Sequence, residues 1–157
     1  MPEVRFRPMT SEDLAAYLAW SIDDYAAAMV RAGRVDEAGA KDLAVTSFER
    51  LLPEGVDTPG QTLLIVEGAA SGERVGILWF GPSGDDPSRA WIYDITIDED
   101  RRGQGWGRAA MAAFEDEARA RGFAGAGLNV HGDNDVARRL YEAMGYTETA
   151  RQMAKSL

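Results

Sequence analysis

The sequence contains no cysteine and a single histidine among its 157 residues. The first absence excludes disulfides, thiolate metal sites and a covalent acyl-cysteine intermediate, and the second excludes a zinc site built from two or three histidines. There is no apolar run of about 18 residues, and the N-terminus lacks the pattern of a signal peptide. We therefore expect a cytoplasmic protein with metal-free chemistry and no membrane segment.

Basic residues are fewer than acidic ones. Lys and Arg number 17 against 26 Asp and Glu, which gives a formal net charge of −9. Electrostatic repulsion therefore disfavours nucleic acids and anionic membranes as partners. The charge suits a cationic partner such as an amine, although solubility alone also explains an acidic surface. The content of 45% hydrophobic and 27% charged residues is ordinary, and the length predicts one domain over residues 1–157.

Hydrophobic periodicity predicts a mixture of strands and helices. Strands are expected at residues 4–7, 62–67, 74–80, 90–97 and 125–130 and in the extended segment from residue 146 onward. Helices are expected from the capping residues 10–13 to Gly33 and at residues 35–52, 108–121 and 134–144. This order predicts an α/β sandwich with a mixed sheet. The β-branched and aromatic run at 90–97 is typical of a central strand covered on both faces.

The most informative stretch is the glycine-rich segment 101–108, Arg-Arg-Gly-Gln-Gly-Trp-Gly-Arg, between that strand and an amphipathic helix. Backbone N–H groups at a helix N-terminus lack partners, and the helix dipole favours an anion there. Glycines permit positive φ and close approach of a ligand, so the segment predicts a phosphate-binding loop, with a tight turn without ligand as the alternative. It lacks the lysine and hydroxyl of a P-loop, and its glycine spacing fits a dinucleotide fold poorly.

Two motifs together resemble the GNAT family of N-acetyltransferases. The first is Arg102-x-x-Gly105-x-Gly107, and the second is the segment 128–146, LNVHGDNDVARRLYEAMGY. The resemblance implies an α/β GNAT acyl-CoA N-acyltransferase fold, with a mixed, mostly antiparallel sheet flanked by about four helices. It also implies acetyl-CoA as cosubstrate and a primary amine of a small molecule, peptide or protein as acceptor. A homodimer is compatible with the resemblance, since relatives often dimerise through sheet edges or their last strands.

The resemblance further implies which residues bind the cosubstrate. Backbone groups near Ile95 and Ile97 would pair with the pantetheine arm, and the glycine-rich segment would hold the pyrophosphate, with Trp106 in a variable position. Asn134 would hydrogen-bond the cosubstrate, although it is also a good helix cap. The implied cofactor-binding residues are Ile95, Thr96, Ile97, Arg102, Gly103, Gln104, Gly105, Trp106, Gly107, Arg108, Asn134, Ala137 and Tyr141.

Tyr141 matches the motif tyrosine, which the resemblance assigns to protonation of the departing CoA thiolate. An ordinary tyrosine pKa of about 10 keeps the phenol protonated at neutral pH and still lets it serve a basic sulfur. The alternative is a core aromatic on a helix face shared with Ala137, Leu140 and Met144.

The general base has several candidates. Asp94 is the one carboxylate inside the apolar strand, where burial would raise a pKa, and a structural buried carboxylate is the alternative. Strand alternation places Asp94 on the face of Ile92 and Thr96, opposite Tyr93. His131 and a water relay to Glu67 are the other candidates. Some relatives carry a glutamate where this chain has Asn129, and an amide cannot accept the proton.

The acceptor itself cannot be identified from the sequence. Trp20, Tyr25 and Trp91 are candidates to line its pocket or to belong to the core. The acidic residues near the first two helices would attract an amine or simply be solvated: Asp23, Asp24, Asp36 and Glu37. Two other functions remain open beside acetyl transfer, a non-catalytic acyl-CoA-binding sensor and a nucleotide-dependent oxidoreductase.

Overall fold

The computed structural model describes residues 1–157 and divides them into two compact units. The first unit contains Met1–Ser11 and Glu54–Asn129, and the second contains Glu12–Pro53 and Val130–Leu157. Each unit therefore combines two stretches that are distant in sequence. The expectation of a single domain stays a prediction.

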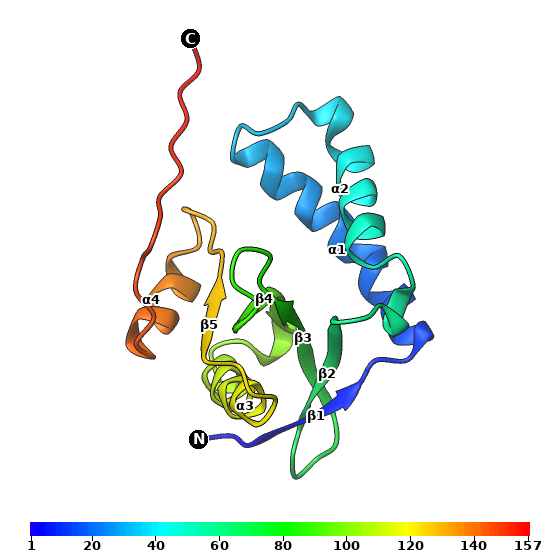
Figure 1. Cartoon of the computed structure of the whole chain (residues 1–157), viewed down its shortest axis with the longest axis vertical. Coiled ribbons are helices and arrows are strands. Elements are labelled where there is room, and N and C mark those ends of the chain that lie inside the picture. Colours follow the sequence, from blue (N-terminus) through cyan, green and yellow to red (C-terminus); the bar gives the residue numbers. More distant parts are fainter. The chain divides into compact units, whose positions relative to one another are not determined.

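A five-stranded sheet forms the centre of the first unit, in the order β1-β2-β3-β4-β5 (Figure 1). The strands are β1 (Val4–Pro8), β2 (Thr62–Gly68), β3 (Arg74–Pro82), β4 (Arg89–Ile97) and β5 (Gly125–Leu128). The first four strands pair antiparallel, and β5 runs parallel to β4. The expected mixed and mostly antiparallel sheet is confirmed.

One amphipathic helix, α3 (Trp106–Ala120), packs against this sheet. Its apolar stripe is buried at Ala110, Met111, Phe114 and Ala118. The Phe114 ring meets Phe80 of β3 edge-on, with 5.2 Å between the ring centroids. Two short 3₁₀ turns, Gly55–Asp57 and Glu99–Arg101, lie in the connections. The helix begins two residues earlier than the sequence predicts, because the glycines before it let the turn close sooner.

The middle strand of the sheet is β3, and its residues Val75–Phe80 are all buried. The expectation that β4 is the fully covered central strand is therefore wrong in part. Residues Tyr93–Ile97 are only half-buried, because β5 pairs with Arg89–Ile92 and ends at Leu128. The strand predicted at 125–130 is correspondingly shorter. The β-branched composition of β4 reflects pairing along its whole length with β3 rather than coverage on both sides.

The second unit contains the helices α1 (Ser11–Arg31), α2 (Glu37–Leu51) and α4 (Asp135–Ala143). α1 and α2 lie side by side and bury a cluster of small and flexible side chains (Figure 1): Ala26, Met29, Ala40 and Ala44. Asp36 caps α2 by accepting a hydrogen bond of 2.9 Å from the backbone nitrogen of Gly39. None of the helices combines the length and apolar character needed to cross a bilayer.

The strand expected after Tyr146 is wrong, because residues 147–157 form neither helix nor strand and are exposed throughout. Their sequence lacks the apolar–polar alternation that buries one face of a strand. Met153 is 86% exposed, so even its apolar side chain finds no core. Arg151 pairs with Glu148 at 2.9 Å, a contact within the segment itself.

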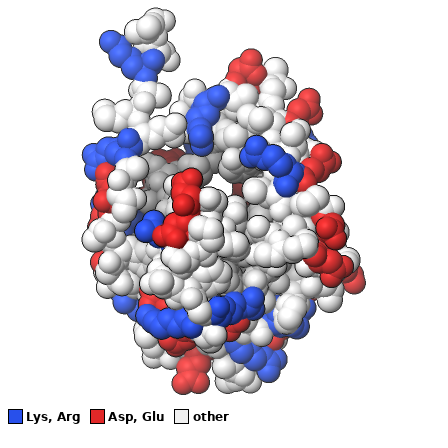
Figure 2. Space-filling model, in the orientation of Figure 1, with Lys and Arg blue, Asp and Glu red and all other residues white.

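The surface charges pair mostly with near neighbours in the sequence. On the face shown in Figure 2, acidic and basic side chains are interspersed. Arg119 and Asp116 approach to 2.8 Å on α3, and Arg138 and Asp135 to 2.8 Å on α4. Exposed pairs of this kind contribute little to folding, about 0–1 kcal/mol each.

Glu67 is the one ionic side chain that is almost fully buried in the sheet, at 8% exposure. Its two carboxylate oxygens accept hydrogen bonds from Arg5 Nε at 2.9 Å and Arg7 Nε at 3.1 Å, which ties β2 to β1. The hydrogen bonds from Arg7 and then Arg5 hold the pKa of this carboxyl below its ordinary value of 4.5. The folded state therefore favours the charged carboxylate.

We expect Glu67→Gln to lower stability in a pH-dependent manner. Because the pKa of Glu67 is lowered on folding, its stabilisation is complete above pH 4.5 and is lost as the pH falls further. Urea unfolding at pH 7 should show a lower midpoint for the variant, and the difference from wild type should shrink towards pH 3. Asp116→Asn, which removes an exposed pair, is the control. A difference that stays constant with pH would contradict the assignment.

Candidate active site

The glycine-rich segment forms a tight turn from the end of β4 to the start of α3. Gly103 and Gly105 adopt positive φ values of 72° and 88°, and Gly105 is the N-cap of the helix. Gly107 lies inside the helix and has no positive φ, so the expected conformational reason for this glycine is wrong. What Gly107 contributes is the lack of a side chain in the first turn.

The start of α3 presents backbone donors without a side-chain cap. Gly105 makes no capping hydrogen bond, and the first helical hydrogen bond runs from Ala109 N to Gly105 O at 3.1 Å. The N–H groups before Ala109 therefore have no partner within the helix. The first turn carries no acidic residue and includes Arg108. The helix dipole, the unpaired N–H groups and the positive charge of Arg108 all favour an anion at the start of α3.

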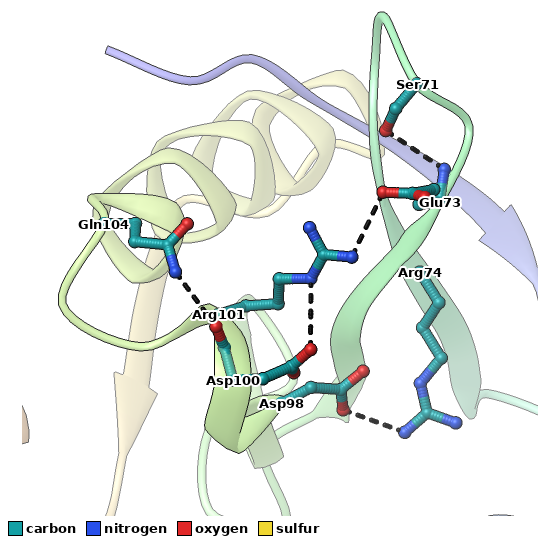
Figure 3. Close-up of polar contacts among 7 residues, drawn as sticks. All are labelled: Ser71, Glu73, Arg74, Asp98, Asp100, Arg101 and Gln104. Carbon is teal, nitrogen blue, oxygen red and sulfur yellow. Dashed lines mark hydrogen bonds and ion pairs between the residues drawn. The ribbon is translucent and has the colours of Figure 1, made fainter.

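Two motif side chains fold back onto the chain and shape the turn. Arg102 donates from Nε to the carbonyl of Ile97 at 3.0 Å. Gln104 donates from Nε2 to the carbonyl of Asp100 at 2.9 Å, as Figure 3 shows. These contacts satisfy carbonyl groups on the acidic side of the turn. They leave the backbone N–H groups at the start of α3 as the polar groups available to a ligand.

The second half of β4 has a hydrogen-bonded neighbour on one side only. β5 pairs with Arg89–Ile92, whereas β3 pairs along the whole strand. Backbone groups of successive residues point to opposite sides of a strand. The Thr96 carbonyl lies directly against the place that a Cβ on Gly76 of β3 would occupy, so it faces β3. The backbone groups of Ile95 and Ile97 therefore point to the side that β5 leaves open.

A β-bulge in β4 changes the face on which Asp94 lies. Phe80 pairs with Ile92, but the preceding residue of β3, Trp79, pairs with Asp94, which leaves Tyr93 as the extra residue. Directly paired residues share a face of the sheet, and neighbours along β3 lie on opposite faces. Asp94 is thus on the Trp79 face, opposite Ile92. The prediction from simple alternation is right for Thr96, which shares this face with Asp94. It is wrong for Ile92, and also for Tyr93, whose ring stacks on Trp79, because alternation holds only for a regular strand.

Asp94 has Thr96 as a hydrogen-bonding neighbour and Trp79 as its cross-strand partner. Thr96 donates from Oγ1 to Asp94 Oδ1 at 3.0 Å. The rings of Trp79 and Tyr93 stack with 4.8 Å between centroids, and Trp79 Nε1 donates to Gln61 Oε1 at 2.8 Å. Phe80, on the other face, meets α3, so Asp94 lies on the face that α3 does not cover. A half-buried carboxylate beside aromatic rings can bind an ammonium group or accept its proton.

The other candidates for the base differ in their environment. Glu67 is held by Arg5 and Arg7, which lower its pKa and make it a poor proton acceptor at neutral pH. His131 is exposed, and its backbone carbonyl accepts a hydrogen bond from Asn134 N at 2.9 Å. Its role as a base stays a prediction.

α4 carries Tyr141 on a half-buried face together with Ala137, Leu140 and Met144. The ring centroids of Tyr141 and Tyr146 are 6.0 Å apart. The sequence correctly places Tyr141 on the apolar face of this helix. Its proposed role towards the thiolate stays a prediction.

Four of the residues considered for an acceptor pocket, Trp20, Tyr25, Asp23 and Asp36, have structural partners. Trp20 packs edge-on against Tyr17 at 5.4 Å, and Tyr25 against Phe48 at 5.9 Å. Asp23 pairs with Lys41 at 3.1 Å. Together with the cap formed by Asp36, these contacts account for most of this set without a ligand.

Comparison with known proteins identifies the family. The model of the acetyltransferase (GNAT) family matches residues 42–146. The chain is 34% identical over 155 residues to the uncharacterized N-acetyltransferase YycN of Bacillus subtilis, covering 98% of this chain and 99% of that protein. It is 29% identical over 150 residues to YdgE of the same organism, covering 95% of each. The chain belongs to the GNAT family, and the predicted enzyme class is confirmed at that level.

Solved structures agree with this assignment. The crystal structure of the putative acetyltransferase YycN superimposes with a TM-score of 0.92 over 98% of each chain. A predicted acetyltransferase with acetyl-CoA from Clostridium acetobutylicum, 14% identical, shares the fold with a TM-score of 0.61 over 98% of this chain and 96% of that one. The predicted GNAT fold is confirmed.

Asn134 caps α4, because its Oδ1 accepts a hydrogen bond of 3.1 Å from the backbone nitrogen of Ala137. The capping alternative is therefore realised. A contact with the cosubstrate would use the amide nitrogen of the same side chain, so the two roles are compatible and separable by mutation.

We expect Asn134→Ala to destabilise the protein by about 1 kcal/mol through loss of the cap. Asn134→Asp should retain nearly all the stability, because a carboxylate also accepts the Ala137 N–H bond and suits a helix N-terminus. Thermal unfolding of the two variants measures the cap. Calorimetric titration of Asn134→Asp with acetyl-CoA then measures the loss of the amide donor together with the added negative charge, and unchanged affinity would show that Asn134 is a cap only.

Proposed function

We propose that the protein transfers the acetyl group of acetyl-CoA directly to a primary amine of a small molecule, peptide or protein. One observation carries this proposal: the uncapped helix start at Gly105 adjoins the open side of β4. An anion site next to strand groups that have no neighbouring strand on one side fits a molecule with a pyrophosphate and an amide-containing arm. Family membership supports the same assignment. A cytoplasmic location belongs to the proposal on sequence grounds only.

The binding residues follow from this arrangement. The backbone N–H groups of residues 103–108 would receive the pyrophosphate, because Gly103 and Gly105 keep side chains away from it. The backbone groups of Ile95 and the N–H group of Ile97 would pair with the pantetheine amides as an added strand, while the Ile97 carbonyl accepts from Arg102. The net charge of −9 does not oppose this, since the donors that contact the phosphates are local and fixed.

The chemistry needs a base, an oxyanion donor and an acid. Acetyl-CoA supplies the acetyl group as a thioester, whose carbonyl carbon an amine can attack. Asp94 would bind the ammonium form of the acceptor and take its proton. A backbone N–H group of β4 would stabilise the oxyanion, and Tyr141 would give its proton to the leaving sulfur. No cysteine is present, so no acyl-enzyme on sulfur forms.

We expect acetyl-CoA and desulfo-CoA to bind in calorimetric titrations and NAD not to bind. Gly103→Glu should weaken CoA affinity by about tenfold or more relative to Gly103→Gln, because a carboxylate repels the pyrophosphate. Both variants share the same backbone strain at positive φ, and a Cβ at Gly103 meets no atom within 4 Å, so their difference isolates charge. Equal affinities would contradict a phosphate site in this loop. Absence of any CoA binding by the wild type would overturn the proposed function.

We expect Tyr141→Phe to lower kcat by at least about tenfold with little change in KM for acetyl-CoA, because the phenol acts on the leaving group. Thiol release with a panel of primary amines measures both constants.

Asp94→Asn should lower kcat/KM for the amine most strongly near neutral pH, where the acceptor is still protonated. If acetyl-CoA binds but no amine releases thiol, the protein is an acyl-CoA sensor.

A further inference from the structure

We propose that the tip of the β2–β3 hairpin positions the phosphate-binding loop, with Glu73 acting through Arg101. The proposal rests on the proposed function of that loop. The hairpin tip, residues 68–74, belongs to neither motif and is separated from the loop by 28 residues at the Glu73–Arg101 contact. Its residues would be positioning residues, because none of them is assigned to touch the cosubstrate.

Ionic contacts cross from the hairpin tip to the turn that precedes the loop (Figure 3). Arg101 Nη2 lies 3.1 Å from Glu73 Oε2, and Arg101 Nε lies 3.5 Å from Asp100 Oδ2. Arg74 Nη2 lies 3.1 Å from Asp98 Oδ1. The two ion pairs have opposite polarity. Arg101 supplies the cation on the loop side of one pair, and Arg74 supplies it on the hairpin side of the other. One pair fixes Arg101, the residue directly before Arg102, and the other fixes Asp98, directly after the end of β4.

The hairpin tip is itself ordered by a local contact. Ser71 accepts a hydrogen bond from the backbone nitrogen of Glu73 at 3.2 Å. The Gly68 amide donates to the carbonyl of Glu73 at 2.9 Å and closes the turn. The carboxylate of Glu73 therefore projects from a structured turn.

Close packing reaches the helix start from the same side. A Cβ on Gly68 would lie 3.1 Å from Cη2 of the Trp106 ring and 2.8 Å from Ser71 Oγ. A Cβ on Gly105 would lie 3.2 Å from Cδ of Pro2. Trp106, the first helical residue, thus packs against the hairpin tip, and Gly105, the cap residue, packs against the N-terminal segment at Pro2.

Between these contacts lies a shallow hollow of about 390 Å³, lined by residues that include Glu3, Ser71, Glu73, Arg101 and Trp106. The loop is consequently not buried against the hairpin along its length. The orientation of the loop therefore relies on the contacts at the rim of the hollow, such as Glu73–Arg101 and Gly68–Trp106. Each of these contacts should influence where the loop N–H groups point.

The exposure of these groups sets the size of the effect. The Arg101 side chain is 33% exposed and that of Glu73 is 62% exposed, so their pair should contribute little to global stability. Its effect should instead appear in ligand affinity, because a loop held in the bound geometry loses less entropy on binding.

A purely electrostatic role and a positioning role of Glu73 predict opposite changes in CoA affinity when Glu73 is neutralised. Glu73 is a negative charge near a site for a phosphate anion, so its neutralisation alone should strengthen CoA binding. If Glu73 positions the loop through Arg101, its neutralisation should weaken binding. The sign of the change therefore distinguishes the two.

The test is calorimetric titration with desulfo-CoA of wild type, Glu73→Gln, Arg101→Gln and the double variant. We expect each single change to weaken binding by roughly two- to fivefold and the double variant to lose no more than the worse single one. KM for acetyl-CoA should rise while kcat stays unchanged. Asp116→Asn, which removes an exposed pair farther along α3, should leave affinity unchanged.

Hydrogen exchange without ligand provides a readout independent of CoA. The amides of residues 103–108 should exchange faster in Glu73→Gln than in wild type. Gly68→Ala should produce the same change by displacing Ser71 Oγ and the Trp106 ring. Tighter CoA binding by Glu73→Gln, strictly additive effects, or unchanged exchange would overturn the positioning role. If wild type binds no CoA but hydrogen exchange of residues 103–108 responds as expected, the proposed function fails. The positioning of the loop by the Glu73–Arg101 contact then still holds.

Discussion

The site depends on backbone groups that the sheet and the helix leave without partners. β4 continues for five residues beyond the stretch that β5 pairs with, and α3 begins at a glycine that offers no side-chain cap. Buried or half-buried backbone groups need hydrogen-bonding partners, so such an arrangement is costly unless water or a ligand supplies them. An anion at the helix start and an extended arm beside β4 are what these groups can receive.

The bulge at Tyr93 has the largest chemical consequence of any local irregularity. Without it, Asp94 would face α3 and its apolar stripe, where a carboxylate would lack a polar partner. The extra residue turns Asp94 to the face of Trp79, where Thr96 donates to it. Bulges commonly re-aim a side chain near an active site, and this one separates the carboxylate from the helix that carries the anion site.

Much of the fold and of the loop could be predicted, because both depend on local patterns. The strand–glycine–helix junction and the amphipathic stripe of α3 can each be predicted from the residue pattern of one short stretch of sequence. The bulge was missed because no glycine or proline marks residues 92–94, and the length of β5 depends on pairing rather than composition. The contact of Glu73 with Arg101 joins distant residues with no periodic signal. The strand predicted from residue 146 onward is wrong, since the residues there do not alternate between apolar and polar.

The central claim is that the N–H groups at the start of α3 bind the phosphates of an acyl-CoA. The most direct measurement is an NMR titration of the ¹⁵N-labelled protein with desulfo-CoA, following each backbone amide. The account predicts saturable shifts that are largest at Gly103, Gln104, Trp106, Gly107 and Arg108, with smaller ones at Ile95 and Ile97. Binding that leaves residues 103–108 unshifted, or no binding at all, would contradict it.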